Sequence, residues 1–139
     1  MNLLTDNSPA LPRWFVPLGR AIVASLFVLG GFNKIVNYAS TLAFMEDVGL
    51  PASGVLLPLT ILLELGGGLA LVLGAPFHRW IAVLLAVFTV LVNFIFHAFW
   101  TYAGPEAVLQ LSLFFKNIAV VGALLLVAAI PQRHKTPAA

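Results

Sequence analysis

The chain has 139 residues, of which 61% are hydrophobic and only 9% are charged. An ordinary soluble domain carries about 25% charged residues, so the composition excludes that class and indicates a membrane protein. The formal net charge of +2 leaves no excess of basic residues for a nucleic-acid-binding surface.

Four apolar runs are each long enough, at about 20 residues, to cross the hydrocarbon core of a bilayer as a helix. Glycine and proline residues interrupt the chain between them. The predicted fold is therefore all-α, a polytopic membrane protein with a bundle of four transmembrane helices. We expect a single domain over 1–139, with polar tails at 1–13 and 131–139 and helices at about 17–36, 54–73, 80–97 and 111–130.

The segment between the first two runs predicts one further, shorter helix. In "YASTLAFMEDVGLP", Leu42, Met45 and Val48 recur at helical spacing. A helix this short cannot cross a bilayer, so we expect it to lie in the membrane interface. It either ties two long helices together or covers an opening in the bundle. The third connection, "TYAGPEAVLQ", can likewise begin a helix at Pro105, before the apolar run starts.

The second run carries a carboxylate near its middle, in "ILLELGGGLALVLG". Thr60, Glu64 and Gly68 recur every four residues and so share one helix face, and the following glycines let a neighbouring helix approach closely. A charged side chain at a helix centre costs about 2.5 to 3.5 kcal/mol on insertion scales. We therefore expect Glu64 to face the bundle interior, either protonated or paired with Lys34 or Lys116.

Other polar residues inside the last two runs extend this pattern. Asn93 and His97 share a helix face with Trp100 just beyond, and Asn117 adjoins Lys116 in the fourth run. Two interpretations remain open: these residues fix helix register or anchor the helix ends, or they bind a ligand together. The candidate polar pocket consists of Lys34, Glu64, Asn93, His97, Trp100, Lys116 and Asn117.

The chain contains no cysteine, so it cannot form a disulfide or hold an iron–sulfur cluster by itself. His78 and His97 lie at opposite ends of the third run, about 28 Å apart at 1.5 Å per residue, and His134 is in the tail. This separation predicts no metal or haem site. Any redox chemistry would need a cofactor or a partner protein.

The basic residues predict the orientation. They gather on one side of the predicted membrane, which the positive-inside rule assigns to the cytoplasm: Arg13, Arg20, Arg79, Arg133 and Lys135. We expect a multi-pass protein of the inner (plasma) membrane with both termini cytoplasmic.

The order and spacing of several motifs resemble the DoxX family of small four-helix membrane proteins, particularly its bacterial inner-membrane members. Residue by residue, the resemblance covers Gly31 and Lys34, Glu64, His97 and Trp100, and Lys116 and Asn117. The motifs are "GRAIVASLFVLGGFNKI", "MEDVGLP", "LPLTILLELGGGLALVLG", "FHRW", "FHAFW" and "FFKNIAVVGALLLV".

The resemblance implies more about fold than about chemistry. Relatives of the family include a membrane subunit of a thiosulfate:quinone oxidoreductase, and this implies an accessory subunit that binds a quinone-like or other amphiphile and supports a soluble or membrane redox partner. The alternative is a non-enzymatic membrane module that binds a lipid or a partner protein. The sequence contains no self-contained catalytic motif, and it assigns neither a catalytic residue nor an oligomeric state.

Overall fold

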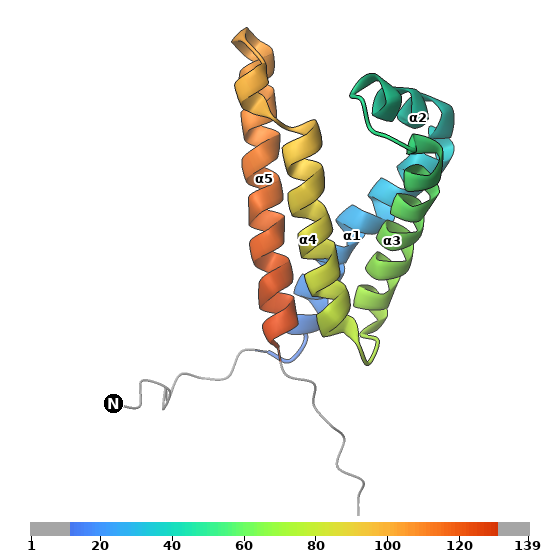
Figure 1. The fold of residues 1–139 in the computed structure, drawn as a ribbon. Helices are drawn as coiled ribbons and strands as arrows, with labels where there is room; N and C mark the ends of the chain where they lie inside the picture. The colour runs from blue at the N-terminus through green and yellow to red at the C-terminus, as the bar shows by residue number, and fades with distance from the viewer. Residues whose placement is uncertain (1–11, 131–139) are drawn as a thin grey trace, which may run out of the picture.

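The computed structural model describes residues 12–130, and every regular element in that range is helical (Figure 1). Four helices are long and apolar enough to cross a membrane, which confirms the predicted all-α transmembrane fold. The predicted tails fall almost entirely outside the described residues. The elements are α1 (Phe15–Val36), α2 (Tyr38–Asp47), α3 (Ser53–Leu73), α4 (His78–Phe96), the 3-10 helix η1 (Phe99–Thr101) and α5 (Gly104–Ala129).

The predicted bounds of α1, α3 and α4 are correct to within two residues. The predicted apolar run at about 111–130 covers most of α5, and the helix begins before it, as Pro105 in the third connection indicated. This helix begins at Gly104, not near residue 111. Pro105 lies in its first turn, where a proline is favourable, and the Glu106 carboxylate complements the positive end of the helix dipole. Hydropathy marks only the apolar part of a helix, so the predicted bound near residue 111 left out the polar first turns.

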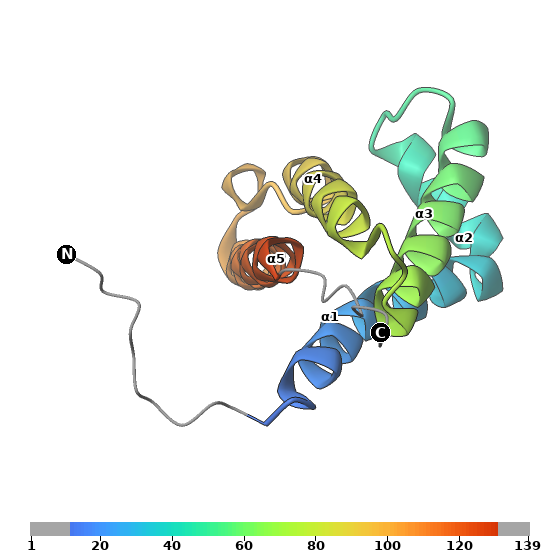
Figure 2. The same ribbon diagram turned by 90° about the horizontal axis from the view of Figure 1, so that it is seen from below.

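The long helices form two pairs, α1 with α3 and α4 with α5 (Figures 1 and 2). The pairs meet at the end of the bundle near residues 12 and 130, and α3 diverges from α4 and α5 toward the end that carries α2. The main core lies where the pairs meet. Its buried residues are Ala24, Phe27, Leu71, Ala82, Leu85, Ala86, Leu124 and Val127.

Small residues let α1 and α3 pack closely, as the glycine run predicted. A Cβ atom on Gly31 of α1 would lie 2.7 Å from Leu65 Cγ, and a Cβ atom on Gly68 of α3 would lie 3.1 Å from the backbone nitrogen of Val28. The absence of side chains at these two positions therefore sets the distance between the helices.

Helix α2 bridges the two pairs at their diverging end. Asn37 separates it from α1, Met45 is buried, and the Phe44 ring stacks on Phe96 of α4 with ring centroids 5.5 Å apart. The predicted short helix is thus present. Its contacts tie α1 to α3, which is one of the two predicted roles, and the role of covering an opening in the bundle stays a prediction.

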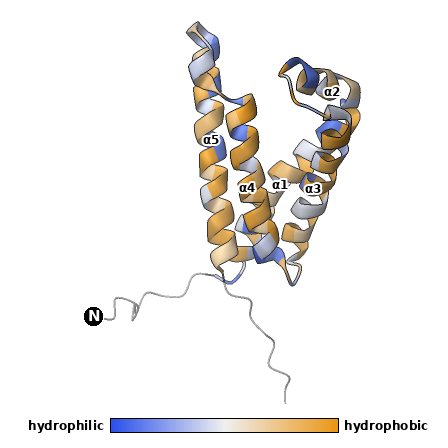
Figure 3. Ribbon diagram, viewed as in Figure 1, coloured by the Kyte–Doolittle hydropathy of each residue, from blue (hydrophilic) through white to orange (hydrophobic). Residues whose placement is uncertain are grey.

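The four long helices consist mostly of apolar residues (Figure 3), and many of these residues are exposed. Leu62, Leu73 and Leu126, for example, are 69%, 81% and 71% exposed. Such surfaces suit contact with lipid acyl chains. Polar positions within the long helices are few, and most of them face another helix.

Candidate functional site

The Glu64 carboxylate is held by Lys34. Lys34 lies in the last turn of α1, and its Nζ atom donates to Glu64 Oε2 at 2.8 Å and to Oε1 at 3.1 Å. The side chains are 27% and 9% exposed, respectively. Of the two partners that the sequence allowed, the structure therefore selects Lys34, and Glu64 faces another helix rather than lipid.

The close packing of α1 and α3 positions this ion pair. A Cβ atom on Gly30 would lie 3.4 Å from Glu64 Oε2, so the carboxylate rests against the α1 backbone. Lys34 is one turn beyond Gly30 on the same face of α1, which brings its ammonium group over the carboxylate. The pair can hold or exchange a proton between its nitrogen and oxygen atoms.

A second polar group joins α4 to α5. Asn93 is fully buried, its Nδ2 donates to the Phe114 carbonyl at 3.2 Å, and its Oδ1 accepts a hydrogen bond from Asn117 Nδ2 at 3.0 Å. Both amides are thus occupied by protein partners. This arrangement is typical of polar residues that fix the register of two transmembrane helices.

His97 directly follows the last residue of α4 and forms a further contact with α5, beyond that of Asn93. Its Nδ1 atom lies 2.8 Å from Gln110 Oε1, and Gln110 Nε2 donates to Glu106 Oε1 at 2.8 Å. Because the Gln110 amide nitrogen faces Glu106, its oxygen faces His97 Nδ1 and accepts the hydrogen bond from it. Sequence reasoning did not include Gln110 and Glu106 among the site residues, because both precede the predicted apolar run that begins at about residue 111. The available signal was the spacing of four residues between Glu106 and Gln110 in a helix that Pro105 can begin.

Trp100 and Lys116 occupy more peripheral positions. The Trp100 ring packs at 5.1 to 6.0 Å from the rings of Phe94, Phe99 and Phe114 and is 56% exposed. Lys116 is exposed on α5 and forms no hydrogen bond or ion pair with residues 12–130.

The seven predicted site residues therefore do not form one network. Lys34 and Glu64 belong to the pair α1 and α3, whereas Asn93, His97, Trp100 and Asn117 belong to the pair α4 and α5. Within residues 12–130, no hydrogen bond or ion pair connects the two sets. The pairs diverge at this end of the bundle, and each set is satisfied by groups within its own pair.

A groove of about 290 Å³ lies between α3 and α4, beside α2. Its wall is apolar except for Thr60, which lies one helical turn before Glu64. The Thr60 hydroxyl forms no hydrogen bond with any described residue, whereas the Thr89 hydroxyl donates to the Leu85 carbonyl at 2.7 Å. The lining residues are Met45, Leu50, Leu56, Leu59, Thr60, Leu63, Phe88, Leu91, Val92, Ile95 and Phe96.

Comparison with known proteins agrees with this architecture. The chain is 42% identical over 113 residues to inner membrane protein YqjF of Escherichia coli (strain K12). This alignment covers 81% of each chain. It is 29% identical over 111 residues to inner membrane protein YphA of the same organism, and this alignment covers 80% of this chain and 79% of the relative. No solved structure matches the chain. The DoxX family matches residues 15–98, and the chain belongs to this family.

Proposed function

We propose that this protein is an accessory membrane subunit, located in the inner membrane, that binds a quinone-like amphiphile and supports a redox partner. One observation carries the proposal: an apolar groove between α3 and α4 contains a single polar side chain, Thr60, whose hydroxyl has no partner among the described residues. The apolar wall suits an isoprenoid or acyl chain, and the hydroxyl suits a carbonyl or hydroxyl oxygen of the ligand.

The depth of Thr60 favours a neutral head group. Thr60 follows Ser53, the first residue of α3, by seven residues, which is about 10 Å along a helix. A charged phospholipid head group at this depth would lose its hydration without gaining a charged partner in the groove. A quinone ring carries no charge and needs only hydrogen bonds to its oxygens.

The Lys34–Glu64 ion pair adds a proton-holding group one turn from Thr60. In this proposal, Thr60 orients the ring and the ion pair handles the proton that accompanies reduction or oxidation. Electrons come from the partner, since a chain without cysteine supplies no thiol electrons of its own.

A second candidate is a non-enzymatic module that holds a lipid or a partner protein. The internal pairing of Asn93 with Asn117 and of His97 with Gln110 favours it, because these polar groups are already occupied within the protein. In that case the groove would hold an acyl chain, and the polar groups would serve only the fold.

Titration of the purified full-length protein with a short-chain ubiquinone, followed by calorimetry, separates the two candidates. Thr60→Val removes the hydroxyl at nearly constant volume and should weaken quinone binding about three- to tenfold, the usual effect of one hydrogen bond. Thr89→Val is the matched control, because Thr89 does not line the groove. Equal affinities in the two variants, or no binding to the wild type, would favour the second candidate.

A further inference from the structure

We propose that the outer face of α4 and α5 is a binding site for one anionic glycerophospholipid. The lipid belongs to the leaflet at the end of the bundle where residues 12 and 130 lie. Its phosphate binds Arg79, and one of its acyl chains lies in a groove between the two helices. This site is separate from the groove that contains Thr60, and only Leu91 borders both.

Arg79 is held in place, and its phosphate-binding edge has no partner among residues 12–130. Its Nε atom donates to the carbonyl of Ala128 in the last turn of α5 at 2.7 Å. Its terminal nitrogens form no hydrogen bond or ion pair with residues 12–130, and the side chain is exposed. A guanidinium group with both terminal nitrogens free binds a phosphate through two parallel hydrogen bonds.

The surroundings of Arg79 match the level of lipid head groups. Arg79 lines a cavity of about 190 Å³ with Trp80, Val83 and Ala128. The Trp80 ring is 77% exposed, and tryptophan is enriched at the boundary between hydrocarbon and head groups.

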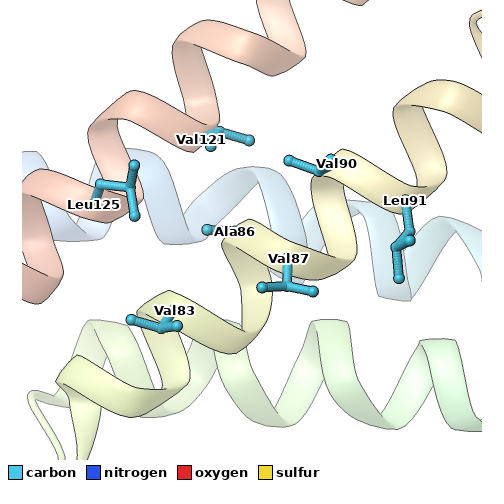
Figure 4. Close-up of a pocket in the computed structure, with 7 residues that line it drawn as sticks. All are labelled: Val83, Ala86, Val87, Val90, Leu91, Val121 and Leu125. Carbon is cyan, nitrogen blue, oxygen red and sulfur yellow. The ribbon is translucent and has the colours of Figure 1, made fainter.

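The acyl-chain groove continues from this cavity. Val83 lines both the cavity at Arg79 and a second cavity of about 290 Å³, whose wall is entirely apolar. Figure 4 shows Val121 and Leu125 of α5 beside the α4 side chains that form the other wall.

The length of this path fits one leaflet. From Arg79 to Leu91 the path follows α4 for twelve residues, which is about 18 Å. Half of a hydrocarbon core about 30 Å thick is about 15 Å. A chain that starts at the Arg79 phosphate would therefore end near Leu91, at the middle of the membrane.

The charges of the site select an anionic lipid over a zwitterionic one. The lining of the two cavities includes one cation, Arg79, and no carboxylate. The positive ammonium group of phosphatidylcholine would therefore find no partner there, whereas the net negative charge of phosphatidylglycerol is matched by Arg79.

Native mass spectrometry of the full chain in detergent, titrated with phosphatidylglycerol or phosphatidylcholine, tests the proposal. We expect one phosphatidylglycerol to bind about tenfold more tightly than phosphatidylcholine. Arg79→Gln should remove this preference. Arg13→Gln is the matched control, because it removes the same charge from an exposed position before α1.

A second pair of variants tests the groove without altering the cation. Val87→Trp fills the groove at a lipid-exposed position, whereas Leu84→Trp adds the same ring on α4 at a residue that lines neither cavity. We expect Val87→Trp to weaken phosphatidylglycerol binding and Leu84→Trp to leave it unchanged. Equal binding of the two lipids by the wild type, or equal phosphatidylglycerol binding within either variant pair, would overturn the proposal.

Discussion

Lys34 Nζ lies 2.8 Å from Glu64 Oε2, so an ion pair joins the end of α1 to the middle of α3 within the transmembrane bundle. The carboxylate is almost fully covered, whereas the lysine side chain retains 27% of its exposure. Glu64 therefore depends on Lys34 for charge compensation, because it has no other charged partner within residues 12–130. Lys34 depends less on Glu64, because its side chain still reaches the edge of the bundle.

Glu64→Leu should destabilise the protein by about 1 to 3 kcal/mol, because it leaves the partly buried Lys34 ammonium group without its partner. The thermal unfolding midpoint in detergent measures this effect. Adding Lys34→Met to Glu64→Leu should recover much of the loss, since an apolar pair can replace a buried ion pair. A double variant that is no more stable than Glu64→Leu alone would show that the ion pair is not the source of the effect.

Glu64→Gln separates a structural role of the carboxylate from a functional one. The glutamine amide oxygen can still accept a hydrogen bond from Lys34, so we expect the variant to fold with an unfolding midpoint close to that of the wild type. It loses the negative charge and the ability to take up and release a proton, and we expect its retention of a bound quinone to fall about tenfold, or about 1.4 kcal/mol. Lipid extraction after identical purifications measures the retained quinone. Equal amounts in the two proteins would assign Glu64 to helix register alone.

Two glycines of the same run should respond to alanine with opposite signs. A Cβ atom on Gly68 would lie 2.8 Å from Val28 Cγ2 and 3.2 Å from the Ala24 carbonyl oxygen, so Gly68→Ala should push α1 away from α3 and lower the unfolding midpoint. Gly66 has nothing within 4 Å of such an atom. Gly66→Ala should therefore raise stability by up to about 1 kcal/mol through helix propensity. A matching loss in both variants would contradict the described packing of α1 on α3.

The fold was largely predictable because each transmembrane helix is marked by its own hydropathy. Periodicity also predicted that Glu64 faces another helix, and the inclusion of Lys34 among its two candidate partners was correct. Pairing between helices was not predictable, because it depends on three-dimensional contacts: the glycines of α1 and α3 bring those helices together, and the resulting division separates Glu64 from Asn93 and His97. The groove residue Thr60 stood out only once the structure showed that its hydroxyl has no partner in the described part of the chain.

The orientation in the membrane is testable because the chain has no cysteine. We expect both termini and Arg79 to face the cytoplasm, since Arg13 precedes α1, Arg20 lies in the second turn of α1 and Arg79 lies in the first turn of α4, all at one end of the bundle. A cysteine introduced at Ala139 should resist an impermeant maleimide added to intact cells, and one at Ala103, between η1 and α5, should react. The reverse labelling pattern would invert the proposed topology.

Lipids that remain bound to the gently purified wild-type protein provide the most direct test of the central claim. Extraction followed by liquid chromatography and mass spectrometry should recover a quinone in about equimolar amount with the protein, and Thr60→Val should recover less of it than Thr89→Val. Recovery of phospholipid without quinone, or the same quinone content in both variants, would contradict the assignment of the groove between α3 and α4 as a quinone site.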